Sequence, residues 1–169
     1  MPKIESCDNF GVVAGRGVYP VLMCREAARR GSRPRLVVAI DEGADKGLAD
    51  YADAFEFVHA GKLDSLIKRF VACGVKSVVF AGQLNPKLLF KGLRPDLRVL
   101  KVLMSLKKKN AATIFEALAD EFAKDGIAIL PAATCLEECL AGEGVLGRIK
   151  PNSSHRGDLD FGRRIVREI

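Results

Sequence analysis

Short runs of apolar residues, separated by polar and glycine-containing turns, recur along most of the chain. Five of them have the length and the β-branched content of buried strands, at residues 10–14, 36–40, 54–58, 77–81 and 127–130. Between them lie segments with apolar residues at helical spacing, including 20–28, 63–71 and 111–122. The alternation predicts an α/β fold with an open, mostly parallel sheet and helices on both faces, Rossmann-like in architecture.

The tip of the first strand is the first candidate for a ligand-binding turn. Gly15 and Gly17 bracket a tight bend there, and Pro20 suits the first turn of the following helix. Because free backbone N–H groups at a helix N-terminus bind anions, the bend is a candidate phosphate site. Its spacing departs from the dinucleotide-binding pattern, since Pro20 replaces a third small residue. A glycine turn that only connects strand and helix is the alternative interpretation.

A second strand tip ends on a glycine further along the chain. The fourth strand leads directly into Gly82, Gln83 and Asn85. The carboxyl ends of parallel strands line the crevice where ligands bind, so the two tips are neighbours if the first and fourth strands are adjacent. Gln83 and Asn85 would then contact a polar ligand. The alternative is that Asn85 and Pro86 only initiate a turn.

The segment 87–109 is basic and amphipathic. Leucines and other apolar residues recur through it, interleaved with Lys87, Lys91, Arg94, Arg98, Lys101, Lys107, Lys108 and Lys109. Such a segment can lie on an anionic membrane or bind phosphates, whereas an apolar stripe at helical spacing more often packs on the core with a solvated opposite face. Both interpretations stay open at this point.

Composition narrows the domain organisation and the class of partner. A chain of 169 residues with 49% hydrophobic content forms one substantial core, which we assign to a Rossmann-like domain over residues 1–141. The net charge of +6 favours an anionic partner. No nucleic acid partner is expected, because single-strand sites stack bases on several aromatic rings and this chain has no Trp and two Tyr.

Residues 142–169 form a linker and a terminal helix in our prediction. Glycines precede the linker's Pro151, and the helix is expected from about Asp158 to Ile169, as the first element of a further domain. His155 is interpreted as a surface residue of the linker, because no second His or Cys lies at metal-ligand spacing. Apolar runs are too short to span a membrane and five cysteines form no C-x-x-C pair, so a cytoplasmic protein with reduced thiols is expected.

The order and spacing of these motifs resemble one family, the N-terminal domain of the LpxI-type UDP-2,3-diacylglucosamine pyrophosphatases of lipid A biosynthesis. The resemblance covers nearly the entire chain. The motifs that carry it are Gly11 to Gly17 with Pro20, Phe80 to Gly82, Leu93 to Asp96, Leu100 to Leu103, Leu118 to Gly126, and Leu146 to Gly162. The chain departs from the family at 110–112, where Asn-Ala-Ala stands in place of a common Gly-Asp-Asp.

The resemblance implies the substrate-binding half of an enzyme that splits the pyrophosphate of a UDP-linked glucolipid into UMP and 2,3-diacylglucosamine 1-phosphate. The implied substrate-binding residues are Gly15, Arg16, Gly17, Gly82, Gln83, Asn85 and Lys101. A divalent metal, Mg²⁺ in our expectation, would serve the full-length enzyme, with none bound by this chain alone. No catalytic residue is assigned here, because the family's catalytic residues belong to a second domain, and the chain alone is expected to be inactive.

Two functions of different classes therefore stand beside each other. In the first, the chain is the substrate-binding part of this hydrolase, with the basic segment contacting a lipid phosphate or an anionic membrane, the latter peripherally at the inner membrane. In the second, it is a stand-alone, noncatalytic module that binds a nucleotide or another phosphorylated ligand. A homo-oligomer is left open in both.

Overall fold

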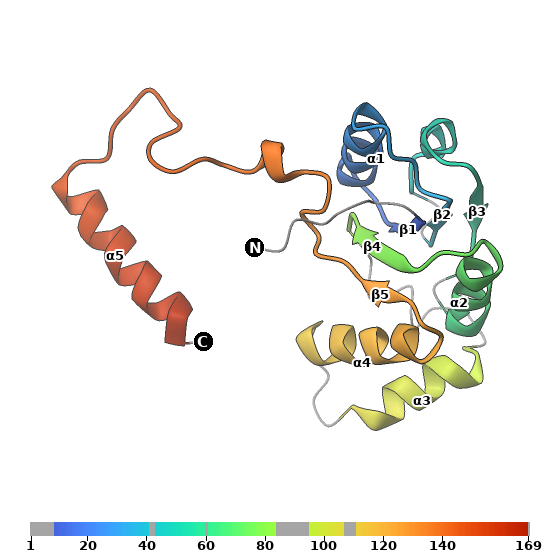
Figure 1. Ribbon diagram of the computed structural model, residues 1–169. Coiled ribbons are helices and arrows are strands. Elements are labelled where there is room, and N and C mark those ends of the chain that lie inside the picture. The colour runs from blue at the N-terminus through green and yellow to red at the C-terminus, as the bar shows by residue number, and fades with distance from the viewer. Residues whose placement is uncertain (1–8, 41–42, 60, 84–94, 107–110, 169) are drawn as a thin grey trace. The chain divides into compact units, whose positions relative to one another are not determined.

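The computed structural model describes residues 9–40, 43–59, 61–83, 95–106 and 111–168. The chain divides into two compact units, one that ends at Glu137 and one that spans residues 138–169 (Figure 1). The first unit holds the sheet and its covering helices, and the second holds a linker and a long helix. Within the described ranges, no helix is both long enough and apolar enough to cross a membrane.

Five parallel strands form one open sheet in the first unit, in the order β3-β2-β1-β4-β5. Their bounds are β1 Phe10–Ala14, β2 Leu36–Ala39, β3 Phe55–Phe57, β4 Ser77–Ala81 and β5 Ala128–Ile129. The strands β1 and β2 are apolar and buried along their whole length, as strands covered on both faces must be. The predicted α/β fold with an open parallel sheet is confirmed.

The border between β1 and β4 is the place where the strand order changes direction. From β1 the chain builds outward through β2 to β3, and then returns to add β4 and β5 on the other side. The register aligns the strand ends, because Ala14 pairs with Ala39 of β2 and with Ala81 of β4. The first and fourth strands are therefore adjacent, and their carboxyl ends meet at the topological switch point where open α/β sheets bind ligands.

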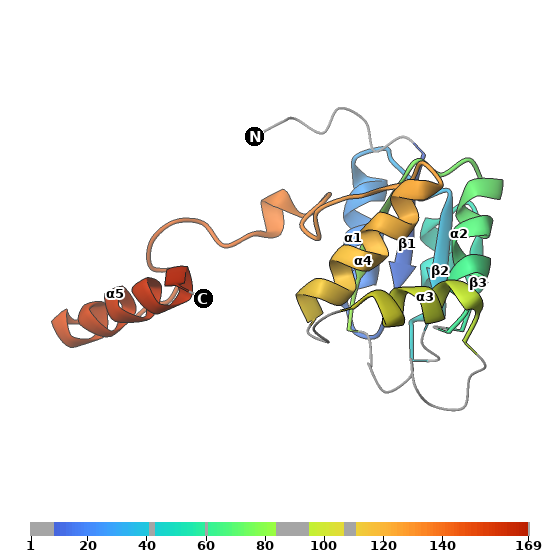
Figure 2. The same ribbon diagram turned by 90° about the horizontal axis from the view of Figure 1, so that it is seen from below.

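Helices cover both faces of the sheet (Figures 1 and 2). On one face lie α1 (Tyr19–Arg29) and the short 3₁₀ helix η1 (Lys46–Tyr51). The other face is covered by α2 (Leu63–Ala72), α3 (Leu97–Ser105) and α4 (Ala111–Lys124). This division follows from right-handed crossovers, which place helices on opposite faces when the chain moves along the sheet in opposite directions.

Each face has its own core. Phe10, Val12 and Met23 belong to the core under α1, whereas Val13 and Phe122 belong to the core under α2 and α4. Successive residues of β1 thus enter opposite cores, which is the period-two alternation of a strand. Burial on both sides fixes the position of the β1 tip and therefore of the turn that follows it.

The second unit contains α5 (Ser153–Glu168). The helix starts earlier than the predicted Asp158, because Asn152 caps it: its Oδ1 accepts the N–H of His155 at 2.9 Å, and His155 Nδ1 accepts the N–H of Asn152 at 3.4 Å. His155 is therefore an exposed residue of the first helical turn instead of a linker residue. Gly157, which weakens a helix, lies inside α5 without ending it.

Candidate functional site

The tips of β1 and β4 are joined through their backbones. The N–H of Gly15 donates to the carbonyl of Ala81 at 2.8 Å. Arg16 and Gln83 form an isolated antiparallel pair, in which each N–H donates to the other residue's carbonyl at 2.9 Å. The two turns are therefore in direct contact. The N–H groups of Gly15, Arg16 and Gln83 already have protein acceptors, so a phosphate bound here takes its backbone donors from the residues after Arg16.

Gly82 allows the two tips to approach this closely. Its φ is +93°, and a Cβ on it would lie 2.7 Å from the carbonyl oxygen of Arg16 and 2.8 Å from Cγ of Pro20. Both the left-handed backbone and the crowding exclude a side chain. Gly82 thus shapes the site by letting the β4 turn cross the start of α1.

Gly17 has the opposite surroundings. Its φ is +96°, yet no described atom lies within 4 Å of the place that a Cβ would take. The helix α1 begins two residues later, and its N-cap residue, Val18, makes no side-chain hydrogen bond to the helix. The start of α1 therefore combines the positive end of the helix dipole with an uncapped first turn beside an open space, which suits an anion.

The side chain of Arg16 extends from the β1 tip toward the loop after β2. A Cβ on Gly43 would lie 2.7 Å from Nε of Arg16, so the guanidinium stem packs against that glycine. Arg16 is exposed, as are Gly17 and Gln83. A cationic side chain and the N-terminus of α1 thus lie on the same edge of the sheet.

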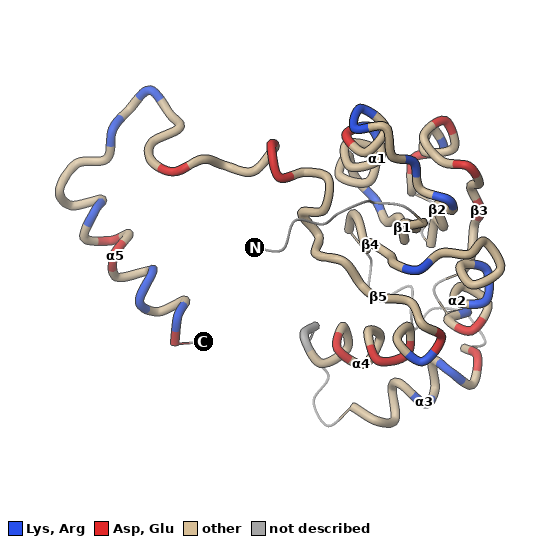
Figure 3. The backbone as a smooth tube through the Cα atoms, in the orientation of Figure 1, with Lys and Arg blue, Asp and Glu red and all other residues tan. Residues whose placement is uncertain are grey.

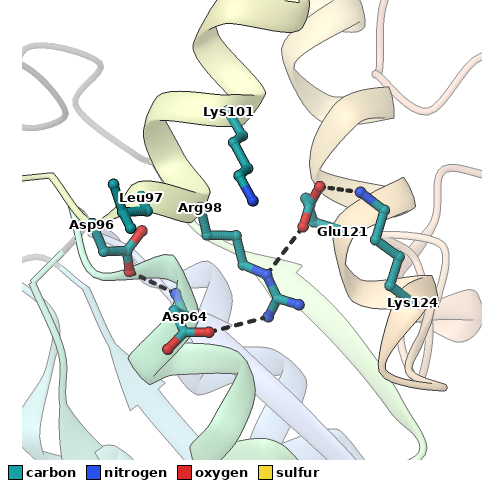
Figure 4. A pocket seen from close by; sticks show the side chains of 7 residues that line it. All are labelled: Asp64, Asp96, Leu97, Arg98, Lys101, Glu121 and Lys124. Atoms are coloured by element: carbon teal, nitrogen blue, oxygen red, sulfur yellow. Dashed lines mark hydrogen bonds and ion pairs between the residues drawn. The ribbon is translucent and has the colours of Figure 1, made fainter.

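A second hollow lies in the helical layer formed by α2, α3 and α4, and we call it the Arg98 pocket (Figure 4). Its volume is about 530 Å³. The lining residues are Asp64, Asp96, Leu97, Arg98, Lys101, Glu121 and Lys124. Most of them are charged, in contrast to the glycine-rich turns at the strand tips.

Arg98 joins the three helices. Its guanidinium lies 3.0 Å from Glu121 and 2.6 Å from Asp125 of the α4 end, and 3.6 Å from Asp64 of α2. The Arg98 side chain is only 20% exposed. Ion pairs of this partly buried kind depend on the simultaneous placement of all the partners, so Arg98 is a structural connection between α2, α3 and α4.

Asp96 caps two helices from one carboxylate. Its Oδ1 accepts the N–H of Val99 in α3 at 2.9 Å, and its Oδ2 accepts the N–H of Asp64 in α2 at 2.7 Å. The N-termini of both helices are thereby supplied with a negative group from the protein itself.

Two acids of the Arg98 pocket, Asp64 and Glu121, are paired with neighbouring cations. A hydrogen bond from Lys68 lowers the pKa of Asp64, and the charges of Lys68 and Arg98 lower it further. Glu121 pairs with Lys124 as well as with Arg98. Carboxylates committed in this way do not fit a divalent cation, and within the described residues no group of three or more His, Cys, Asp or Glu side chains is placed to hold a metal.

Lys101 extends into the Arg98 pocket between Arg98 and Glu121 (Figure 4). Of the predicted site residues, the structure brings together five at the strand tips: Gly15, Arg16, Gly17, Gly82 and Gln83. It places Lys101 on α3 in the helical layer, and Asn85 lies outside the described residues.

Sequence reasoning did not find the Arg98 pocket as a unit. The one local signal was Asp96, which follows Pro95 immediately before an apolar periodic segment and is typical of an N-cap. The ion pairs of Arg98 join residues from three separate helices, so no spacing in the sequence indicates them.

Comparison with known proteins identifies related sequences. The family described as the LpxI N-terminal domain matches residues 9–139. The UDP-2,3-diacylglucosamine pyrophosphatase LpxI of Caulobacter vibrioides is 33% identical over 165 residues, covering 95% of this chain and 57% of that protein. The chain therefore spans little more than half the length of this relative.

Proposed function

The chain belongs to the LpxI N-terminal domain family, and from this premise we propose that it is the substrate-binding half of a pyrophosphatase acting on UDP-2,3-diacylglucosamine. The observation that carries the proposal is the open start of α1 beside Gly17, at the switch point between β1 and β4. A pyrophosphate-linked substrate presents the doubly anionic group that such a site attracts.

The backbone of α1 supplies the phosphate donors in this proposal. The first N–H groups of a helix have no intrahelical acceptor, which in α1 leaves those of Val18, Tyr19 and Val21, since Pro20 has none. Arg16 adds positive charge next to them, and the exposed Gln83 side chain is proposed to contact the polar part of the nucleotide. Lys101, which belongs to the helical layer, is proposed to contact the glucolipid part.

The proposed domain organisation is a Rossmann-like domain over residues 1–141, followed by a linker and the first helix of a second domain that provides catalysis. The helix α5 supports it, because large apolar side chains on it are exposed: Phe161 is 59% and Val166 is 76% exposed. An amphipathic helix gains stability mainly by burying its apolar side against a further element.

A divalent metal, Mg²⁺, is proposed for the complete enzyme, where it would neutralise phosphate charge and orient water. The acids of the Arg98 pocket are not its ligands in this proposal, because Arg98, Lys68 and Lys124 already pair with Asp64 and Glu121, and Asp96 accepts backbone N–H groups. The part played by this chain is to hold the nucleotide end of the substrate. We also propose that the chain works in peripheral contact with an anionic membrane, since the acyl chains of the substrate reside in a bilayer.

Titration with UDP tests the phosphate site. We expect Gly17→Ala to weaken UDP binding by about tenfold, because a methyl group at the α1 start displaces a phosphate from one or two charge-assisted hydrogen bonds. Gly31→Ala is the matched control: Gly31 has φ +75°, also has no described atom within 4 Å of its Cβ position, and follows the other end of α1.

Both substitutions place a side chain in a left-handed backbone, so both cost a similar amount of stability. A shift in UDP affinity for Gly17→Ala alone, measured by isothermal titration calorimetry with matched circular dichroism, supports the proposed site. Equal affinity in the wild type and both variants would show that the turn is only a connection between β1 and α1.

A further inference from the structure

The outer side of α3 carries large apolar side chains in solvent. Leu97 is 76%, Leu100 39% and Met104 86% exposed, whereas Val99 and Val102 on the inner side are 7% and 5% exposed. Core packing therefore explains the inner side of this helix and leaves the outer side without an explanation.

The three exposed residues form one stripe. They lie at spacings of three and four residues, which places them on the same side of an α-helix. Single exposed apolar residues are ordinary on protein surfaces, but three on adjacent turns of one helix form a continuous patch. We call Leu97, Leu100, Lys101 and Met104 the outer α3 face.

Among the residues that the structure describes, no helix covers this face. α3 packs onto both α2 and α4 through its inner side and lies outermost in the helical layer, crossing in front of the sheet in Figure 2. Asp96 attaches the N-terminus of α3 to the start of α2, because its N–H donates to the carbonyl of Gly61 at 3.0 Å and its carboxylate caps α2. The patch is thus presented on a helix that is fixed at one end.

The charge of α3 is positive and unevenly neutralised. The helix contains Arg98 and Lys101 and no acid (Figure 3). Arg98 is paired with three carboxylates. Lys101 is exposed and lies four residues after Leu97 and three before Met104, and its side chain extends from this side of α3 into the Arg98 pocket (Figure 4). The described residues provide no ion pair for it.

We propose that the outer α3 face docks on an anionic lipid bilayer. Leu97, Leu100 and Met104 enter the boundary between headgroups and acyl chains, and the positive charge of Lys101 beside them attracts the negatively charged lipid surface. A helix side with apolar residues, a cation and no acid complements an anionic bilayer, in which negatively charged headgroups cover apolar acyl chains. The inference deepens the membrane part of the proposed function and does not depend on nucleotide binding.

Tryptophan fluorescence tests which side chain enters the bilayer. The chain has no Trp, so Met104→Trp places the only Trp of the variant on the outer α3 face. Val71→Trp is the control, since Val71 is a 48% exposed apolar residue of α2 outside this face. With vesicles of phosphatidylcholine and phosphatidylglycerol, we expect a blue shift of the emission for Met104→Trp alone. An unchanged emission for Met104→Trp, or an equal shift for Val71→Trp, would overturn the proposal.

Vesicle sedimentation measures how much the outer α3 face contributes to the affinity for vesicles. We expect Met104→Glu and Leu97→Glu each to lower the association constant for vesicles by about tenfold, because each removes an inserted apolar group and adds a negative charge that the anionic lipids repel. Val71→Glu makes the same change of charge on α2 and is expected to bind like the wild type. Binding of the wild type should weaken at high salt and on vesicles of phosphatidylcholine alone.

Three outcomes would overturn the inference. The wild type does not sediment with anionic vesicles, or Val71→Glu loses as much binding as Met104→Glu, or the wild type is a dimer that Met104→Glu converts to a monomer. The last result would assign the stripe to an interface between two copies. UDP titration of the same variants separates this test from the proposed function, because Met104 lies outside the nucleotide site and its variants are expected to retain UDP affinity.

Discussion

The turns at the ends of β1 and β4 and the Arg98 pocket are two concave regions of one domain that are built in different ways. At the turns, backbone hydrogen bonds between Arg16 and Gln83 and a close approach at Gly82 set the geometry. In the pocket, ion pairs of Arg98 with acids from α2 and α4 set it. The first region is therefore sensitive to added atoms, and the second to changes of charge.

The two regions also treat helix N-termini differently. In the pocket, the carboxylate of Asp96 occupies backbone donors at the starts of α2 and α3. At the turns, α1 begins without a side-chain cap. Since a capped N-terminus has already bound its anion, the start of α1 is the one of these three that retains the capacity to bind a phosphate. This contrast, more than the presence of glycines, favours the turns as the nucleotide site.

The largest effect that we expect comes from Gly82→Ala. The new methyl group meets the Arg16 carbonyl oxygen and Pro20 and requires a left-handed backbone, so the free energy of unfolding should fall by about 3 kcal/mol. Gly17→Ala has the same kind of backbone and open surroundings, and it should lose only about 1 kcal/mol. Urea unfolding followed by circular dichroism measures both.

This pair of variants separates crowding from backbone strain. The difference between the two losses reports the contact between the turns, because the strain from positive φ is common to both positions. If Gly82→Ala lost no more stability than Gly17→Ala, the two turns would not be in the close contact that defines the first region.

The sequence predicted the first region better than the second, for a physical reason. Strand tips can be located because apolar runs end sharply, as at Ala81, and because the ends of parallel strands share one edge of the sheet. Ion pairs between helices depend on how the helices approach one another, which the chain does not display locally. Lys101 was grouped with the turns only through the family resemblance, and the structure places it on α3.

The boundaries of two elements were also predicted inaccurately, because hydrogen bonds that set them are not visible in the pattern of apolar residues. Of the predicted strand 127–130, only Ala128 and Ile129 are in register with β4 as β5, opposite Ser77 and Val78, and the N–H of Leu130 makes the last hydrogen bond to this strand, to the carbonyl of Val78 at 2.8 Å. The start of α5 was missed because the reciprocal hydrogen bonds between Asn152 and His155 outweigh the helix-weakening Gly157. In both cases the pattern of apolar residues located the element, and hydrogen bonds set its ends.

An intermediate effect is expected from Arg98→Met. The substitution keeps much of the side-chain volume but leaves Asp64, Glu121 and Asp125 without their shared cation, so the free energy of unfolding should fall by about 2 kcal/mol, less than for a fully buried pair. Lys124→Met removes an exposed partner of Glu121 alone and should cost less than about 0.5 kcal/mol.

Urea unfolding of these two variants at low and high salt tests the charge-built character of the pocket. Equal losses for Arg98→Met and Lys124→Met would mean that Arg98 does not connect the three helices. If Arg98→Met lowers the free energy of unfolding but leaves UDP affinity unchanged, the pocket is separate from the nucleotide site.

The smallest effect concerns the titration of Asp64 at the edge of the pocket. The hydrogen bond from Lys68, followed by the charges of Lys68 and Arg98, lowers the pKa of this carboxyl below its ordinary 3.8 in the folded chain. The stabilisation from its ionised form is thus present above that ordinary value and is lost as the pH falls through the lower, folded pKa. Lys68→Met should raise the pKa of Asp64 more than Arg98→Met does, because Lys68 provides the larger contribution.

Carbon chemical shifts of the Asp64 carboxyl, followed by NMR between neutral and acidic pH, measure this order directly. Because Arg98→Met should have the larger effect on stability and Lys68→Met the larger effect on the pKa of Asp64, the two variants separate the connecting role of Arg98 from local pairing at the start of α2. If Arg98→Met raised the pKa of Asp64 more, then Arg98 rather than Lys68 would be the main cause of the lowered pKa of this carboxyl. Arg98 alone would then account both for the ion pairs that build the pocket and for the lowered pKa of Asp64, whereas the turns are built by backbone hydrogen bonds.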